Sequence, residues 1–170
     1  MLNQAARGGA AIGAASAYQR RDADALSRFG VTLDELDALT PRNRCARLLD
    51  IVLGDAGHPD DAALRKAAGE QVKKIILAGS DAPAPSAGES IRSFVGEMTL
   101  QLSLVELRNQ ILAGVTSPQV ATRKERGLRQ WITAKLRNLD LAAYGKVTAV
   151  TCHQVAANLT RDALVLLAAR

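Results

Sequence analysis

This sequence has few of the residues that usually carry chemistry. Its 170 residues include five aromatic side chains, two histidines and two cysteines. Cys45 and Cys152 stand far apart, without the close Cys and His spacing of metal sites, so we expect two buried core thiols and no metal. No uninterrupted apolar run reaches the ~18 residues that span a bilayer, and the start lacks a convincing signal-peptide core. We therefore expect a soluble, cytoplasmic protein.

The common catalytic and nucleotide-binding motifs are also missing. The chain has no GxxxxGK[ST] loop, no GxGxxG after a strand, no GxSxG elbow and no HExxH. His58 stands in a polar loop before Pro59, and His153 lies off the apolar stripe of its helix. We predict no enzyme, no catalytic residue and no cofactor, which leaves binding as the function class.

Apolar residues recur with helical spacing along almost the whole chain. Alanine and leucine dominate the apolar fraction, a balance that favours helix over sheet. No strand pattern persists, so we predict an all-α bundle or array of about six or seven helices. The predicted helices cover about 10–29, 32–39, the segment from Pro41 to Gly54, a segment closed by Gly79, 90–113, 118–138 and 148–169.

Helix starts are marked by capping residues. Thr32 to Glu35 has the capping-box spacing, and Thr40 precedes a proline at a first helical position. Ser117 likewise precedes Pro118, while Thr116 to Gln119 also fits a capping box. We predict a helix start at each of these places.

The chain reads as one domain, 1–170. A stretch rich in proline, serine and glycine at 79–88 could subdivide it into two units. We favour a surface loop there, because about 80 residues on each side would make two rather small cores. Residues 1–9 are predicted to be disordered.

The predicted helix 90–113 is apolar on two faces. One face carries Ile91, Phe94, Val95, Met98, Leu102 and Val105, and the other carries Leu100, Leu104, Leu107 and Ile111. Such a helix is either central in a bundle or buries its second face in a partner. The second face is therefore a candidate partner-binding surface.

The excess of positive over negative charge lies in the second half of the chain. Residues 1–85 carry eleven basic and eleven acidic side chains, whereas 86–170 carry eleven basic and six acidic ones. On the amphipathic helix 118–138, Trp131 falls on the core side. The basic side chains that fall in a separate arc of about 120° are Arg123, Arg126, Arg129 and Arg137. This basic ridge is either a solvated face or a surface for an acidic protein or for nucleic acid.

Two long segments stand in a recognisable order, "FGVTLDELDALTPRNRCARLLDIVLGDAGHPDDAALRKAAGEQVKKIIL" at 29–77 and "SFVGEMTLQLSLVELRNQIL" at 93–112. In this order they resemble the QatB family, the B component of a four-part anti-phage defence system. "GGAAIGAASAYQRR" at 8–21 looks like the end of that family's Gly/Ser/Ala/Arg-rich N-terminal region. The chain departs from the family at its start, which has no glycine at position 2.

The resemblance implies a bacterial, non-enzymatic subunit. Its direct partner would be a QueC-like enzyme, with an ATPase and a TatD-like nuclease in the wider system. It also implies that the family's N-terminus is a substrate for modification, a site that cannot be mapped onto these residues. The alternative hypothesis is a nucleic-acid-binding module that uses the basic helix 118–138, although no aromatic residue is placed among the arginines to stack bases.

Overall fold

The computed structural model describes residues 2–54, 59–78, 83–114, 116–138, 140–144 and 146–168. These ranges contain helices and no strand, which confirms the all-α prediction. The elements in chain order are α1 (Leu2–Gln19), α2 (Ala23–Ser27), α3 (Leu33–Asp37), α4 (Pro41–Leu53), α5 (Pro59–Ile76), α6 (Ala87–Leu112), α7 (Pro118–Arg137), the 3₁₀ turn η1 (Leu141–Tyr144) and α8 (Cys152–Ala168). Within the described part of the chain, no helix combines the length and apolar character needed to cross a membrane.

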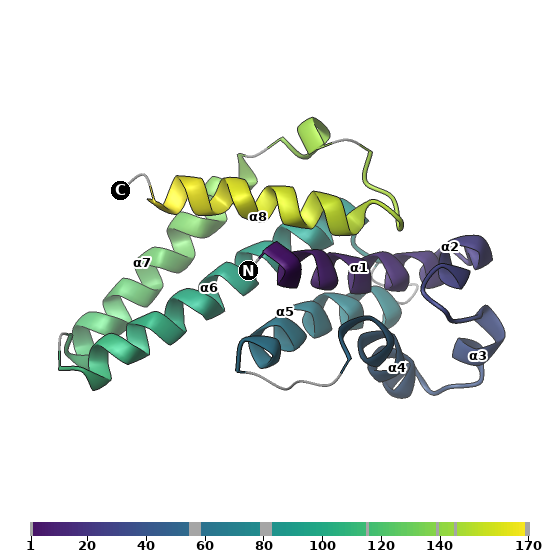
Figure 1. Ribbon diagram of the computed structural model, residues 1–170, viewed down its shortest axis with the longest axis horizontal. Coiled ribbons are helices and arrows are strands. Elements are labelled where there is room, and N and C mark those ends of the chain that lie inside the picture. The colour runs from purple at the N-terminus through teal and green to yellow at the C-terminus, as the bar shows by residue number, and fades with distance from the viewer. Residues whose placement is uncertain are drawn as a thin grey trace.

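Helix α1 is the central element of the body. It runs through the middle of the molecule in Figure 1, and it packs most extensively against α8 and α5. A Cβ atom added at Gly13 would lie 2.2 Å from the carbonyl oxygen of Ala149, so only glycine allows this approach. The prediction of disorder was wrong for residues 2–9, because α1 begins at Leu2 and Ala5 is fully buried.

One apolar core joins the two halves of the chain. It includes Leu48 and Val72 from before the loop at 79–88, and Phe94 and Leu159 from after it, all fully buried. Residues 79–82 of that loop lie outside the described residues, and 83–86 are not helical. The described core therefore does not divide at the loop.

Three predicted helix starts are confirmed by their capping hydrogen bonds. The side chains of Thr32, Thr40 and Ser117 each accept a hydrogen bond from the backbone N–H three residues later. The alternative cap at Thr116 was wrong, since Ser117 holds that position. A capping box at Ser86 and Glu89 was not foreseen, and there the Glu89 carboxylate accepts from the Ser86 N–H at 2.9 Å.

A polar cluster fastens the end of α1 to α3. Arg21 donates two hydrogen bonds to the Asp37 carboxylate, at 2.7 and 2.6 Å, and the Tyr18 hydroxyl donates a third at 2.7 Å. The bidentate Arg21 contact holds the pKa of Asp37 well below its ordinary range. The guanidinium of Arg44 covers the Tyr18 ring, 4.7 Å from its centroid.

Helices α6 and α7 form an antiparallel hairpin that extends beyond the body. In Figure 1 its turn lies at the lower left, well away from α4, α5 and α8. We call the outer part of this hairpin, residues 100–112 and 118–130, the arm. Among its described side chains, three large apolar ones are exposed, namely Val105, Leu112 and Val120.

Candidate partner-binding surface on helices α6 and α7

A heptad series of apolar residues runs along one face of α6. Ile91, Met98, Val105 and Leu112 occur at every seventh position, the spacing that keeps one helix face against a neighbouring helix. We call these four residues the α6 seam. Their exposed fractions are 0%, 1%, 40% and 80% in that order. The seam is therefore buried in the body and uncovered in the arm.

The inner half of the seam is covered by helices of the same chain. Phe94, one turn from Ile91 and Met98, touches α1 so closely that a Cβ atom at Gly8 would lie 2.0 Å from its ring. Helices α1, α5 and α8 all pack against α6. None of them follows α6 as far as the turn of the arm in Figure 1.

The predicted partner face of α6 is occupied by α7 in its inner part. Leu100 is only 2% exposed and lines a cleft together with Ile132 and Leu136 of α7. Leu104 packs against the core, and Ile111 is partly buried. The side chain of Leu107 lies outside the described residues. Leu100 thus has no surface left for a partner, because α7 folds back over it.

The four arginines of the predicted ridge do not form one equivalent surface. Arg123 and Arg126 are exposed and make no ion pair with the described residues. Arg129 forms ion pairs with Glu97 of α6 at 3.5 Å and with Glu125 at 3.9 Å. Arg137, the last residue of α7, lines the cleft between the two helices. Two of the four guanidinium groups therefore turn toward α6.

Glu97 was missed by the sequence reasoning. Its spacing from Arg129 is 32 positions, so no helical periodicity links them. Only the antiparallel return of α7 places the two groups together. Trp131, by contrast, packs against the core as its helical position predicted, and the Lys135 ammonium lies 5.8 Å from its ring centroid.

The cysteines and histidines are the remaining side chains with reactive groups. Cys45 and Cys152 are both buried, as predicted, and burial raises the pKa of the Cys152 thiol to about 12. His153 is exposed, with Nδ1 2.8 Å from the carbonyl oxygen of Val150. His58 lies outside the described residues. The described residues contain no group of three or more His, Cys, Asp or Glu side chains that could hold a metal.

Comparison with known proteins adds no relative. The sequence matches no protein-family model, and neither the curated proteins nor the solved structures include a significant match. The geometry of the chain itself therefore carries the functional argument.

Proposed function

We propose that this chain is a non-enzymatic helical subunit that binds a partner protein through the outer α6 seam, Val105 and Leu112. One observation supports this above all others. The same heptad face is covered by helices in the body and left 40% and 80% exposed in the arm. Solvent-exposed apolar residues that continue a buried seam are typical of a surface completed by another helix.

The occupant that matches this surface is an amphipathic helix. Heptad spacing presents side chains along one face of α6, where another helix can lie alongside them. Burial of a leucine side chain is worth about 1.5–3 kcal/mol. Leu112, with 80% of its surface exposed, is therefore the strongest single anchor.

Charge favours a different, acidic protein over a second copy of the chain. The chain carries a formal net charge of +5. The arm holds exposed Arg108, Arg123 and Arg126, none of which has an ion pair with the described residues. Two arms packed together would bring these like charges close, whereas acidic side chains beside the partner's apolar stripe would complement them.

The resemblance to QatB gives this partner a candidate identity. On that reading the chain works in an anti-phage defence complex and binds a QueC-like enzyme, with an ATPase and a TatD-like nuclease in the wider system. A QueC-like enzyme is therefore the first protein to test against the seam.

A second candidate function is nucleic-acid binding by helix 118–138. It is favoured by the exposure of Arg123 and Arg126, whose guanidinium groups are available for phosphates. It is disfavoured by Arg129, which is already paired with Glu97 and Glu125. Of the four arginines of the ridge, three then remain without an ion pair to the described residues.

The test is affinity capture from the native host with matched variants. Leu112→Asp places a charge on the outer seam, and Leu77→Asp does the same at another exposed leucine, 57% exposed just after α5. Partner binding should weaken about tenfold or more in Leu112→Asp, since a lost leucine anchor is worth about 1.5 kcal/mol or more. It should be unchanged in Leu77→Asp.

A third variant distinguishes the two functions. Arg123→Glu combined with Arg126→Glu should abolish salt-sensitive DNA or RNA binding if the chain is a nucleic-acid module. Absorbance of the captured material at 260 and 280 nm reports nucleic acid directly. Nucleic acid that co-elutes at low salt, disappears in this double variant and persists in Leu112→Asp would overturn the partner proposal.

A further inference from the structure

A cleft of about 320 Å³ lies between α6 and α7, in the part of the hairpin that adjoins the arm. Its apolar lining comes from Gly96 and Leu100 of α6 and from Ile132 and Leu136 of α7. Gly96 lets α7 pack closely against α6 here, because a Cβ atom at this position would lie 3.0 Å from a methyl group of Leu136. The volume is at the lower end of the ~300–1,000 Å³ typical of small-molecule sites, which are common between helices.

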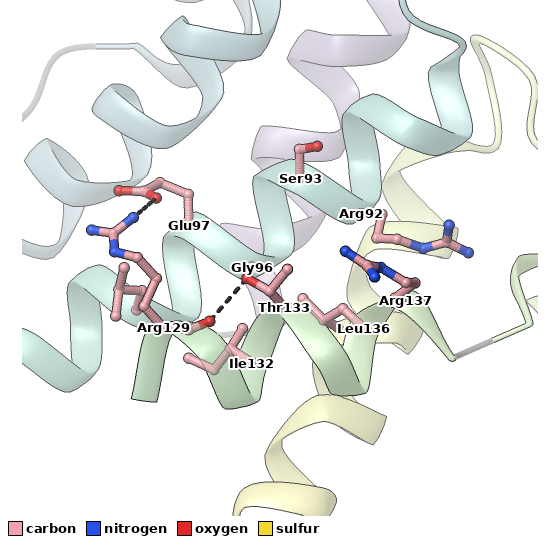
Figure 2. A pocket seen from close by; sticks show the side chains of 10 residues that line it. Arg92, Ser93, Gly96, Glu97, Arg129, Ile132, Thr133, Leu136 and Arg137 are labelled. Carbon is pink, nitrogen blue, oxygen red and sulfur yellow. Dashed lines mark hydrogen bonds and ion pairs between the residues drawn. The ribbon is translucent and has the colours of Figure 1, made fainter. Parts of the chain in front are cut away.

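The charged residues of the cleft are unevenly placed. Figure 2 shows the Arg129–Glu97 ion pair, 3.5 Å long, at one end, and Arg92 and Arg137 at the other. Arg92 has an interaction of its own. Arg137 makes no ion pair with the described residues, so its guanidinium group is available to a ligand.

The end of the cleft near Arg137 has a positive field. Glu97 is the only acidic group among the described residues of the lining and is paired with Arg129, which leaves the Arg137 guanidinium without a carboxylate partner among the described residues. The C-terminus of α7 adds about half a negative charge. That partial charge is too small to cancel the full positive charge of Arg137.

The hydroxyl groups of the cleft differ in what they can offer. Thr133 Oγ1 donates to the Arg129 carbonyl oxygen at 2.9 Å, so it can only accept a further hydrogen bond. Ser93 is exposed, and its hydroxyl points away from Arg137 in Figure 2. The donor to an anion at this end is therefore Arg137, while the floor offers apolar contact.

We propose that this cleft binds a small organic carboxylate, with the carboxylate on Arg137 and an apolar body on the floor beside Gly96 and Ile132. The planar guanidinium fork matches a carboxylate with two parallel hydrogen bonds. The apolar floor selects against a bare inorganic anion, which would gain nothing from it. This site is independent of the α6 seam, since neither Val105 nor Leu112 lines it.

The test is an NMR titration of the full chain with three probes, in which backbone amide shifts locate the binding site. 4-Phenylbutyrate has both the carboxylate and the apolar body, 4-phenylbutyramide keeps the body without the charge, and inorganic phosphate keeps a charge without the body. The carboxylate should bind about tenfold more tightly than the amide, because a charge-assisted hydrogen bond is lost in the amide. The shifts should centre on Gly96, Ile132 and Arg137.

Two variants complete the test. Arg137→Gln should weaken carboxylate binding about tenfold and leave amide binding unchanged. Lys124→Gln removes one exposed positive charge from α7 outside the cleft and should change neither. Equal affinity for acid and amide, phosphate binding as tight as carboxylate binding, or an undiminished carboxylate affinity in Arg137→Gln would overturn the proposal.

Discussion

Substitution of Gly13 by alanine should destabilise the fold even though alanine is the better helix former. The added methyl carbon would lie 2.2 Å from the Ala149 carbonyl oxygen, which is about 1 Å inside normal contact distance. The obstacle is backbone that leads into α8, so α1 and that segment must move apart. Overpacking of this kind typically costs about 1–3 kcal/mol, and the obstacle here places Gly13→Ala near the upper end.

The helix-propensity gain of about 1 kcal/mol offsets only part of this loss. We expect a net destabilisation of about 2 kcal/mol, equivalent to about 4–8 °C in the unfolding midpoint for a chain of this length. Thermal unfolding followed by circular dichroism at 222 nm measures it. The matched control is Gly127→Ala in α7, where an added Cβ meets nothing within 4 Å.

The control variant should show the opposite sign, since it gains propensity without a clash. Gly127→Ala should raise the midpoint by about 2–4 °C, which corresponds to about 1 kcal/mol. A Gly13→Ala protein as stable as wild type, alongside the expected rise in Gly127→Ala, would refute the close packing of α1 against the start of α8.

Two further predictions concern titratable groups. Because Arg21 holds the pKa of Asp37 low, that ion pair stabilises the fold above about pH 4 and the stabilisation is lost as the pH falls. The urea midpoint of Asp37→Asn should therefore change less between about pH 5 and pH 2.5 than the urea midpoint of wild type. Asp34→Asn, a control on the same helix, should behave like wild type. Parallel pH profiles of the urea midpoint for Asp37→Asn and wild type would contradict the prediction. Burial raises the pKa of both the Cys152 and the Cys45 thiol. Ellman's reagent should therefore label neither thiol rapidly at pH 8 until urea is added. Immediate labelling of the native protein would contradict the burial of these thiols.

Local signals predicted most helix starts in this chain. Thr32, Thr40 and Ser117 can be read from sequence because a cap and the three residues after it form one local unit. Ser86, which forms a capping box with Glu89, has the same local geometry, but it lies within the stretch 79–88 that was predicted to be a loop.

The N-terminal helix could not be predicted with the same ease. The glycines of 1–13 are typical of flexible segments and also of helices that pack unusually closely. In the folded chain, Gly8 packs against Phe94 and Gly13 packs against Ala149. Both partners lie far along the chain from the glycines. Composition cannot distinguish these cases, because the stabilising contacts are tertiary.

The two faces of α6 show the same limit at the candidate site. Periodicity correctly predicted that both faces are apolar, but it could not tell which would be covered by the chain itself. Helix α7 returns over Leu100, whereas Val105 and Leu112 extend beyond the helices of the body. The candidate partner surface is therefore the outer part of the first face, Val105 and Leu112, and not the second face. Partner binding by this surface stays a prediction.

Photo-crosslinking at position 112 in the native host tests the central claim most directly. A benzophenone side chain at Leu112 should yield one major adduct with a single acidic partner, joined through an amphipathic helix of that protein, while the same group at Leu77 should yield none. An adduct with a second copy of this chain, an adduct with nucleic acid, or equal adducts from both positions would contradict the account.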